Sequence, residues 1–207
     1  WRFKRQIVKS RIKHILNLQK RKIHGRKCTI KEIDSGTKNQ FLNKYHLQGE
    51  DRSEIKLGAF YKKRLVAVMT FSKLRKALGQ NSKEGCYELS RFCTINTFAI
   101  IGIAGKLLKH FERIYAPSYL ISYADRRWSM GDLYRNLGFS LSHFSKPGYY
   151  YTNDYATLSH RFTFQKHLLK KKLKIFDNSL SEWENMKNNG YDRIWDCGQY
   201  VFKKDYK

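Results

Sequence analysis

The stretch from residue 87 to residue 144 most constrains the fold, because strand-like and helix-like patterns alternate along it. Tyr87–Thr94 and Tyr119–Tyr123 have the aromatic and β-branched content of strands. Gly102–Ile114 lies between them and carries apolar residues at helical spacing, and a helix over Met130–Leu137 and a strand over Phe139–Phe144 follow. A chain of 207 residues fits one ordinary domain with extensions. The pattern predicts an α+β fold, a mixed sheet flanked by helices.

The upstream part of the chain adds further elements of the same domain. The sequence predicts a strand over Cys28–Ile33, a helix over Ser35–Tyr45 with Ser35 or Thr37 as its cap, and a hairpin of Ile55–Tyr61 with Leu65–Phe71. The polar, basic stretch Leu74–Gly85 is expected to form a loop.

Basic segments flank this domain on both sides. Residues 1–27 contain no acid and are expected to form a basic helix with one apolar stripe, which either contacts phosphates or links to a preceding domain. A second basic helix is expected over Arg161–Phe176, followed by a short helix over Ser181–Asn189 and a last strand over Tyr200–Lys203. The expected organisation is therefore a helix or linker over 1–27, an α+β domain over 28–158 and a basic helical extension over 159–207.

Two motifs in the alternating stretch resemble the GNAT superfamily of N-acetyltransferases. They are Ile101-Gly102-Ile103-Ala104-Gly105, at the start of the first helix, and Leu133-Tyr134-Arg135-Asn136-Leu137-Gly138-Phe139, at the end of the second. The resemblance implies acetyl-CoA or another acyl-CoA as cofactor, with its pyrophosphate at the glycine turn. The residues it implies for cofactor binding are Phe92, Cys93, Gly102, Ala104 and Gly105. Ala99 departs from the family pattern, which has Gln or Arg at this position.

The net charge indicates a polyanionic partner. The chain has 42 Lys and Arg against 17 Asp and Glu, a formal charge of +25, and such self-repulsion opposes compactness unless a polyanion offsets it. Binding to DNA or RNA is the expectation, since basic residues are interleaved with aromatic ones. A generally solubilising surface and attraction to anionic lipid remain as alternatives. No apolar run is long enough to cross a bilayer, and no signal peptide is visible.

Longer motifs are similar to the C-terminal module of phage homing-type endonucleases, in which the module follows a nuclease domain of the EDxHD (Vsr-like) or GIY-YIG sort. They include Glu88-Leu89-Ser90-Arg91-Phe92, Ser122-Tyr123-Ala124-Asp125-Arg126-Arg127-Trp128 and Lys146-Pro147-Gly148-Tyr149. A more distant resemblance, through Glu88-Leu89-Ser90-Arg91, is to the phage Mom DNA-modification proteins. The resemblance implies a DNA-binding module, for duplex DNA above RNA, linked to a nuclease domain in the cytoplasm of an infected bacterium. The alternative is a Mom-like acyl-CoA-dependent transferase acting on a DNA base.

The candidate catalytic residues follow from the transferase reading. Acyl transfer needs a base near the amine, and Glu88 is the first choice, with Asp125 at the end of the next strand. Strict alternation would place Glu88 and Ser90 on one face of their strand. Tyr134 matches the position of the tyrosine acid in the acetyltransferases. The competing interpretation is structural, with Glu88 paired to Arg91 or Arg126 and Tyr134 in the core.

The nucleic-acid candidates combine guanidinium or ammonium groups with aromatic rings. The set is Arg91, Arg126, Arg127, Trp128, Lys146, Tyr149, Arg161, Lys166, His167 and Lys170. An interior cation–π cluster or a solvated basic face would have the same composition. No metal site is expected, because the four cysteines include no C-x-x-C pair, and no clustered carboxylates suggest a nuclease centre.

Overall fold

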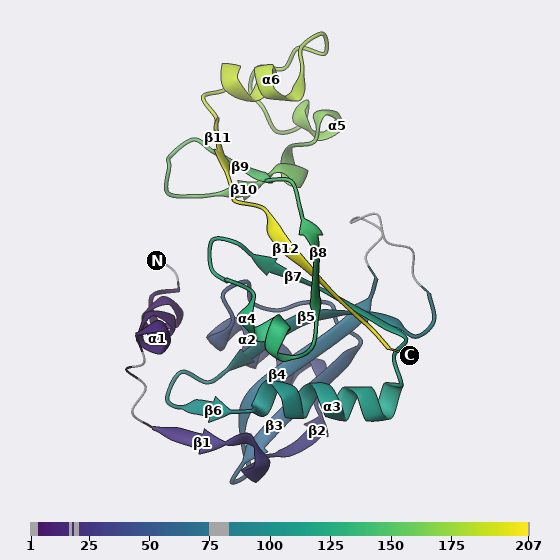
Figure 1. Ribbon diagram of the computed structural model, residues 1–207. Coiled ribbons are helices and arrows are strands. Elements are labelled where there is room, and N and C mark those ends of the chain that lie inside the picture. Colours follow the sequence, from purple (N-terminus) through teal and green to yellow (C-terminus); the bar gives the residue numbers. More distant parts are fainter. Residues whose placement is uncertain (1–3, 17, 19–20, 75–82, 207) are drawn as a thin grey trace. The chain divides into compact units, whose positions relative to one another are not determined.

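The computed structural model describes residues 4–16, 18, 21–74 and 83–206 (Figure 1). Most of the loop expected over Leu74–Gly85 lies outside these residues. Among the described residues, no helix is both long and apolar enough to span a bilayer. The chain divides into two compact units: unit 1 comprises residues 1–123, 132–142 and 202–207, and unit 2 comprises residues 124–131 and 143–201.

A seven-stranded sheet with the strand order β2-β3-β4-β5-β7-β12-β8 forms the centre of the fold. Strands β2 to β5 are antiparallel neighbours, whereas β5 and β7 are parallel, so the sheet is mixed. This confirms the expected α+β class. The bounds are β2 Thr29–Glu32, β3 Ile55–Tyr61, β4 Arg64–Lys73, β5 Cys86–Thr94, β7 Tyr119–Asp125, β8 Ser140–Phe144 and β12 Gln199–Asp205.

The hairpin of β3 and β4 is present as expected, with its turn at Lys62 and Lys63. Both turn residues have positive φ, 49° and 65°, the conformation that a tight hairpin requires. Apolar side chains of β4 are completely buried, including Val68, Met69 and Phe71. This strand therefore lies in the core of unit 1.

Helix α3, Ile103–Tyr115, packs on this sheet through one apolar face. Ile103, Leu107 and Phe111 are buried, and the ring of Phe111 stacks on that of Phe71 at 3.7 Å between centroids. Helix α2, Ser35–Tyr45, has the expected bounds, but its cap is Asp34, whose side chain accepts a hydrogen bond from the Thr37 amide. The prediction of Ser35 or Thr37 as cap was wrong, because the carboxylate of Asp34, the residue before Ser35, accepts the hydrogen bond from the first turn of the helix.

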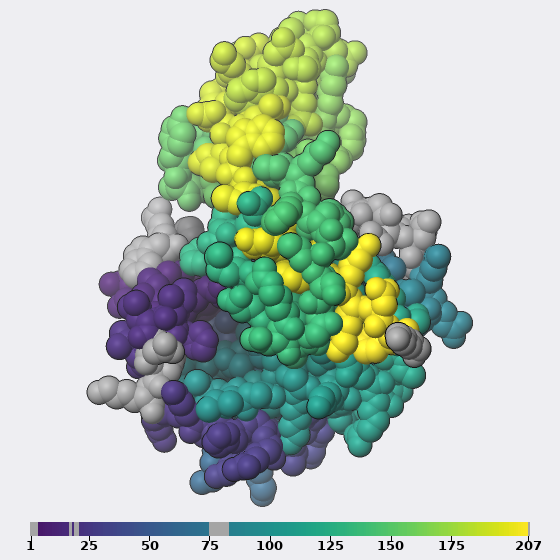
Figure 2. Space-filling model, in the orientation of Figure 1, coloured from purple at the N-terminus to yellow at the C-terminus, as the bar shows by residue number. Residues whose placement is uncertain are grey.

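The N-terminal segment is only partly helical. Helix α1 covers Arg5–Ile15, and β1 (Lys22–His24) follows and pairs in parallel with β6 (Ala99–Ile101). A 3-10 turn, η1 (Gly25–Lys27), leads into β2. A single helix over 1–27 was therefore wrong, because backbone pairing with β6 recruits residues 22–24. The purple atoms of this segment lie at the surface of unit 1 in Figure 2.

Unit 2 contains a three-stranded antiparallel sheet of order β10-β9-β11. Its strands are β9 Tyr149–Thr152, β10 Ser159–His160 and β11 Asp192–Trp195, joined by η3 Arg161–Phe164, α5 Lys166–Leu169 and α6 Glu182–Asn188. Tyr151, Phe164, Leu169 and Met186 form a small separate core. The N-terminus of α6 has the capping box expected of Ser181 and Glu184.

The single basic helix expected over Arg161–Phe176 is absent, and only four-residue helical pieces stand there. Gln165 has extended backbone angles, φ −60° and ψ 142°, which break the helix. The apolar residues of this segment wrap around the small core instead of forming one stripe. The 159–207 region is therefore mixed rather than helical, with β10 and β11 in one sheet and β12 in the other.

Candidate functional site

The parallel strands β5 and β7 pair over only three positions, Cys86 to Glu88 with Tyr119 to Ile121. Beyond Glu88, β5 continues to Thr94 with its pairing to β4 alone. A β-bulge interrupts that pairing, since Arg91 lies opposite Thr70 while Leu89 lies opposite Phe71. The extra residue is Ser90. A bulge bends its strand and re-aims side chains, and here it lies where β5 leaves β7.

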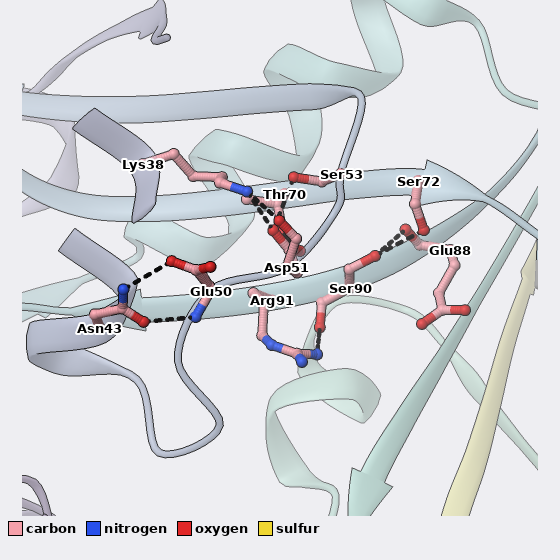
Figure 3. Close-up of polar contacts among 10 residues, drawn as sticks. All are labelled: Lys38, Asn43, Glu50, Asp51, Ser53, Thr70, Ser72, Glu88, Ser90 and Arg91. Carbon is pink, nitrogen blue, oxygen red and sulfur yellow. Dashed lines mark hydrogen bonds and ion pairs between the residues drawn. The ribbon is translucent and has the colours of Figure 1, made fainter. Parts of the chain in front are cut away.

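The bulge overturns the strict alternation expected for β5. The Ser90 hydroxyl lies 2.8 Å from that of Ser72, and Arg91 folds back so that its Nη1 donates to the Ser90 carbonyl at 2.8 Å. In Figure 3 the Ser90 hydroxyl points toward Ser72, whereas the carboxylate of Glu88 and the guanidinium of Arg91 point to the other side of the strand. Glu88 therefore shares its side with Arg91 rather than with Ser90.

Tyr134 interacts with both Glu88 and Arg91. It lies on α4 (Asp132–Asn136), and its ring stacks on Phe202 at 4.9 Å between centroids. Burial raises the pKa of its hydroxyl and the carboxylate of Glu88 raises it further, while hydrogen bonding with Ser122 and the charge of Arg91 oppose the rise. Ser122, Arg91 and Glu88 thus all act on the Tyr134 hydroxyl, and we call these four residues the tyrosine cluster.

The tyrosine cluster is shielded from water on the strand side. Glu88 is 3% exposed and Ser122 is 1% exposed, and the Ser122 hydroxyl donates to the Leu89 carbonyl at 2.8 Å. A buried carboxylate that acts on a phenol with a raised pKa is suited to proton transfer, since such groups gather at functional sites. Two candidates from the sequence, Glu88 and Tyr134, are therefore brought together.

The glycine turn lies at the N-terminus of α3, where helical amides lack intrahelical partners. Gly102 has φ +75°, and a Cβ placed on it would have no atom within 4 Å. An open pocket of about 520 Å³ adjoins the turn. Its walls are formed by His24, Arg26, Ile101, Gly102, Gly105, Lys106 and Lys109.

Two basic walls of this pocket come from the N-terminal segment, which sequence reasoning missed. Gly25 allows the close approach, since its Cβ would lie only 3.0 Å from the Ile103 nitrogen and 3.1 Å from the Ile101 oxygen. Lys106 holds the segment in place by donating to the carbonyls of Gly25, Arg26 and Cys28. Ala99 supplies no cation to the turn, and Arg26 brings positive charge there from another part of the chain.

The other expected cofactor residues, Phe92, Cys93 and Ala104, are all half-buried. Phe92 and Cys93 lie on β5 opposite Met69 and Val68. Burial raises the pKa of the Cys93 thiol, so this cysteine stays protonated and is a poor nucleophile. The four cysteines are free, and the described residues contain no group of three or more His, Cys, Asp or Glu placed to hold a metal ion.

A buried ion pair lies on the α2 side of β4. Lys38 Nζ is 2.8 Å from Asp51 Oδ1, and the two side chains are 2% and 8% exposed. Although burial opposes it, hydrogen bonds from Lys38, Thr70 and Ser53 hold the pKa of Asp51 below its ordinary value (Figure 3). The pair anchors the segment that follows α2 to the central strand.

His46 follows α2 and is also affected by Arg91. Burial first, and then the charge of Arg91, lower its pKa from 6.5 to about 4, against the opposing charge of Asp51. Its Nδ1 accepts a hydrogen bond from the Gln48 amide at 3.2 Å. The imidazole is therefore neutral at physiological pH.

This shift predicts an acid-dependent loss of stability. Because the folded pKa of His46 is below the unfolded value, its contribution is complete above pH 6.5 and is lost as the pH falls toward 4. Between pH 7 and pH 5 the unfolding free energy of the wild type should fall by about 2 kcal/mol more than that of His46→Gln, as measured in urea titrations. The exposed His167→Gln should behave as the wild type, and equal losses in all three proteins would contradict the assignment.

Asp125 and Arg127, both in unit 2, pair with each other. Arg127 Nη2 lies 2.6 Å from Asp125 Oδ2, and its Nε donates to Oδ1 at 3.0 Å. Although burial opposes it, these bonds lower the pKa of Asp125, while the hydrogen bond to Asp125 raises the pKa of Arg127. A carboxylate held in this way is a weak base, so Asp125 is a poorer catalytic candidate than Glu88.

The remaining nucleic-acid candidates are on the surface, apart from Arg91, which belongs to the tyrosine cluster. Arg126 lies over the rings of Phe144 and Tyr200, at 5.0 and 5.6 Å, and donates to the Cys197 carbonyl. Exposed side chains are Trp128, Lys146, Arg161, Lys166, His167 and Lys170, and Tyr149 is half-buried. Sequence reasoning missed Arg193 and Trp195, which lie on β11 beside Tyr149.

Comparisons with known proteins give similarity at the level of solved structures only. No protein-family model matches the sequence, and no curated protein does. The chain is similar to a GNAT family acetyltransferase from Elizabethkingia anophelis with acetyl-CoA bound, at 14% identity and a TM-score of 0.48, over 87% of this chain and 99% of that one. It is also similar to a Bacillus subtilis acetyltransferase in complex with CoA (12%, TM-score 0.45, 87% and 100%) and to Ard1 from Thermoplasma volcanium (10%, TM-score 0.49, 87% and 99%). These similarities assign no residue a role.

Proposed function

We propose that unit 1 is an acyl-CoA-dependent acyltransferase acting on an amine. The observation that carries this proposal is the separation of β5 from β7 after three paired residues, with Tyr134 and Glu88 of the tyrosine cluster beside it. Neighbouring parallel strands that separate leave backbone amides and carbonyls without a strand partner, and a ligand can supply those bonds.

The pocket at Gly102 suits the phosphate end of such a cofactor. The amides of the first turn of α3 and the positive end of its dipole favour an anion, and Arg26 and Lys109 add formal charge. The missing side chain at Gly102 leaves the backbone open to close approach. His24, Gly105 and Lys106 complete the walls.

The tyrosine cluster would handle the protons. When bound, an acyl-CoA supplies a thioester carbonyl, which is already activated toward an amine. The Glu88 carboxylate would accept the proton that the amine loses when it attacks the thioester. It is buried and lies on the same side of β5 as Arg91. The Tyr134 hydroxyl keeps its proton because burial raises its pKa, so it is available as a donor at Oη. Ser122 would orient that hydroxyl.

For the acceptor we propose an amino group on a nucleic-acid base. The support is the formal charge of +25 over the whole chain, concentrated in segments such as the acid-free residues 1–27. The role as the DNA-binding module of a phage homing-type endonuclease stays a prediction from sequence resemblance, and the structural comparisons add no support to it.

Acetyl-CoA binding tests the proposal at the pocket. Arg26→Glu should weaken acetyl-CoA affinity about tenfold or more in calorimetry, because a charge-assisted contact is lost and a like charge is introduced. Lys31→Glu makes the same charge change at an exposed position on β2 and should bind as the wild type. Absence of binding to the wild type, or equal loss in both variants, would sink the proposal.

A further inference from the structure

The exposed aromatic side chains are concentrated in unit 2. Among the described residues, every large aromatic side chain that is exposed belongs to this unit: Trp128, Phe144, Tyr155, Phe162 and Trp195. The exposed large hydrophobic residues in the described part of unit 1 are all aliphatic. Few exposed aromatics are expected on a surface without a binding role.

Four side chains of unit 2 contact one another in succession, in the order Phe162, Arg161, Tyr149 and Trp195. We call these four residues the aromatic row. The guanidinium of Arg161 lies over the rings of Phe162 and Tyr149, at 5.4 and 5.3 Å, and Tyr149 is 4.9 Å from Trp195 between ring centroids. Phe162 and Trp195 are 52% and 57% exposed. The row therefore presents flat groups to solvent at both of its ends.

The sheet of unit 2 positions the row. Trp195 is the register partner of Tyr149 across β11 and β9, and the Tyr149 hydroxyl donates to Glu182 at 3.0 Å. Arg193, on the same strand as Trp195, is half-buried over Tyr149, Tyr151 and Trp183 and holds the small core together. The sheet thus holds Tyr149 and Trp195 in place, and the guanidinium of the row, that of Arg161, is exposed.

The charges of unit 2 favour an anionic partner. Every carboxylate of unit 2 already accepts hydrogen bonds within the unit: Asp125, Asp154, Asp177, Glu182, Glu184, Asp192 and Asp196. All residues of this unit are described. The ion pair in it with a nitrogen–oxygen distance below 4 Å is that of Arg127 with Asp125. The other acids are satisfied by amides and hydroxyls. Exposed Lys170 and Lys171 therefore make no ion pair with a carboxylate of this unit at that distance.

We infer that the aromatic row binds unpaired nucleobases of a single-stranded nucleic acid. Bases stack on aromatic and guanidinium planes, and the backbone follows cationic side chains. A duplex keeps its base faces stacked inside, so it offers nothing to Phe162 and Trp195. An acidic protein segment would satisfy the lysines but has no planar groups for the rings. The inference concerns unit 2 and does not depend on acyl transfer.

Fluorescence anisotropy with the full chain, without acyl-CoA, tests this inference. The probes are a labelled oligothymidine of about 20 nucleotides, which exceeds the usual site size, and a mixed-sequence duplex of the same length. Phe162→Ala and Trp195→Ala should each weaken single-strand binding about tenfold, with a larger loss in the double variant. The control Ile175→Ala removes an equally exposed apolar side chain that is not aromatic and should bind as the wild type.

Two further readouts separate stacking from charge. The ring substitutions should leave the salt dependence of binding unchanged, whereas Arg161→Ala should reduce the slope of log K against log salt by about 0.7. Thermal unfolding and Trp195→Leu, which retains apolar bulk without the indole, show whether a loss reflects misfolding. Tighter binding of the duplex, equal competition by polyglutamate, or equal affinities of the ring variants and the control would overturn the inference.

Discussion

Replacing Tyr134 with phenylalanine is expected to slow acyl transfer about 10²- to 10⁴-fold, the usual contribution of a positioned general acid. The substitution removes one oxygen, and the ring keeps its packing on Phe202 and Phe139. Affinity for acetyl-CoA should change little, because the pocket that would hold the phosphates lies at Gly102. Transfer of radiolabelled acetyl groups to oligonucleotides, single-stranded and duplex, measures the rate.

Tyr115→Phe is the matched control for this experiment. Tyr115 is the last residue of α3, and the substitution removes a hydroxyl that donates a hydrogen bond to Glu32. It should leave the rate unchanged. Because burial raises the pKa of Tyr134 above its ordinary value of 10, an alkaline fall in rate due to this residue should have its midpoint above pH 10. Equal rates for Tyr134→Phe and Tyr115→Phe would remove Tyr134 from the mechanism.

Replacing Lys38 with methionine is expected to lower the unfolding free energy by about 3–5 kcal/mol, since it leaves the Asp51 carboxylate buried without its cation. Methionine keeps most of the volume, so the loss reports the charge rather than a cavity. Urea unfolding followed by circular dichroism measures the change in midpoint. Lys38→Met with Asp51→Asn should recover part of the loss.

The exposed pair Lys73 and Glu54 provides the control, at 3.5 Å and with side chains 66% and 54% exposed. Lys73→Met should cost under about 1 kcal/mol. The folded pKa of Asp51 is below its ordinary value of 3.8, so the contribution of the buried pair is complete above that pH and is lost as the pH falls through the lowered pKa. Similar losses for Lys38→Met and Lys73→Met would show that the buried pair carries no special weight.

The sequence was sufficient for the elements whose signals are local. The hairpin of β3 and β4, helix α3 and the capping box at Ser181 follow from periodicity, turn composition and side-chain capping, which depend on neighbouring residues alone. Glu88 and Tyr134 were found as candidates through the resemblance of their motifs, and the structure places them in one cluster.

The features that sequence reasoning missed depend on distant contacts. The bulge at Ser90 arises from the register with β4, and no residue type marks it. The pairing of β1 with β6 joins segments 77 residues apart, as the partnership of Lys22 with Ala99 shows. The spacing of the leucines and phenylalanines in Arg161–Phe176 is compatible with a helix. The small core of unit 2, which the sequence does not reveal, determines which of them are buried.

The attachment of β1 beside the glycine turn couples two properties that would otherwise be independent. His24 and Arg26 are walls of the pocket, and their segment is held by a three-residue ladder and by Lys106. Any anion that uses these walls must bind more tightly when the segment is docked than when it is detached. By reciprocity, the same anion then strengthens the docking by an equal free energy. The docking of residues 22–27 is in this way coupled to the filling of the pocket, and a second ligand that binds the docked and the detached segment with different affinities will change the affinity of the pocket.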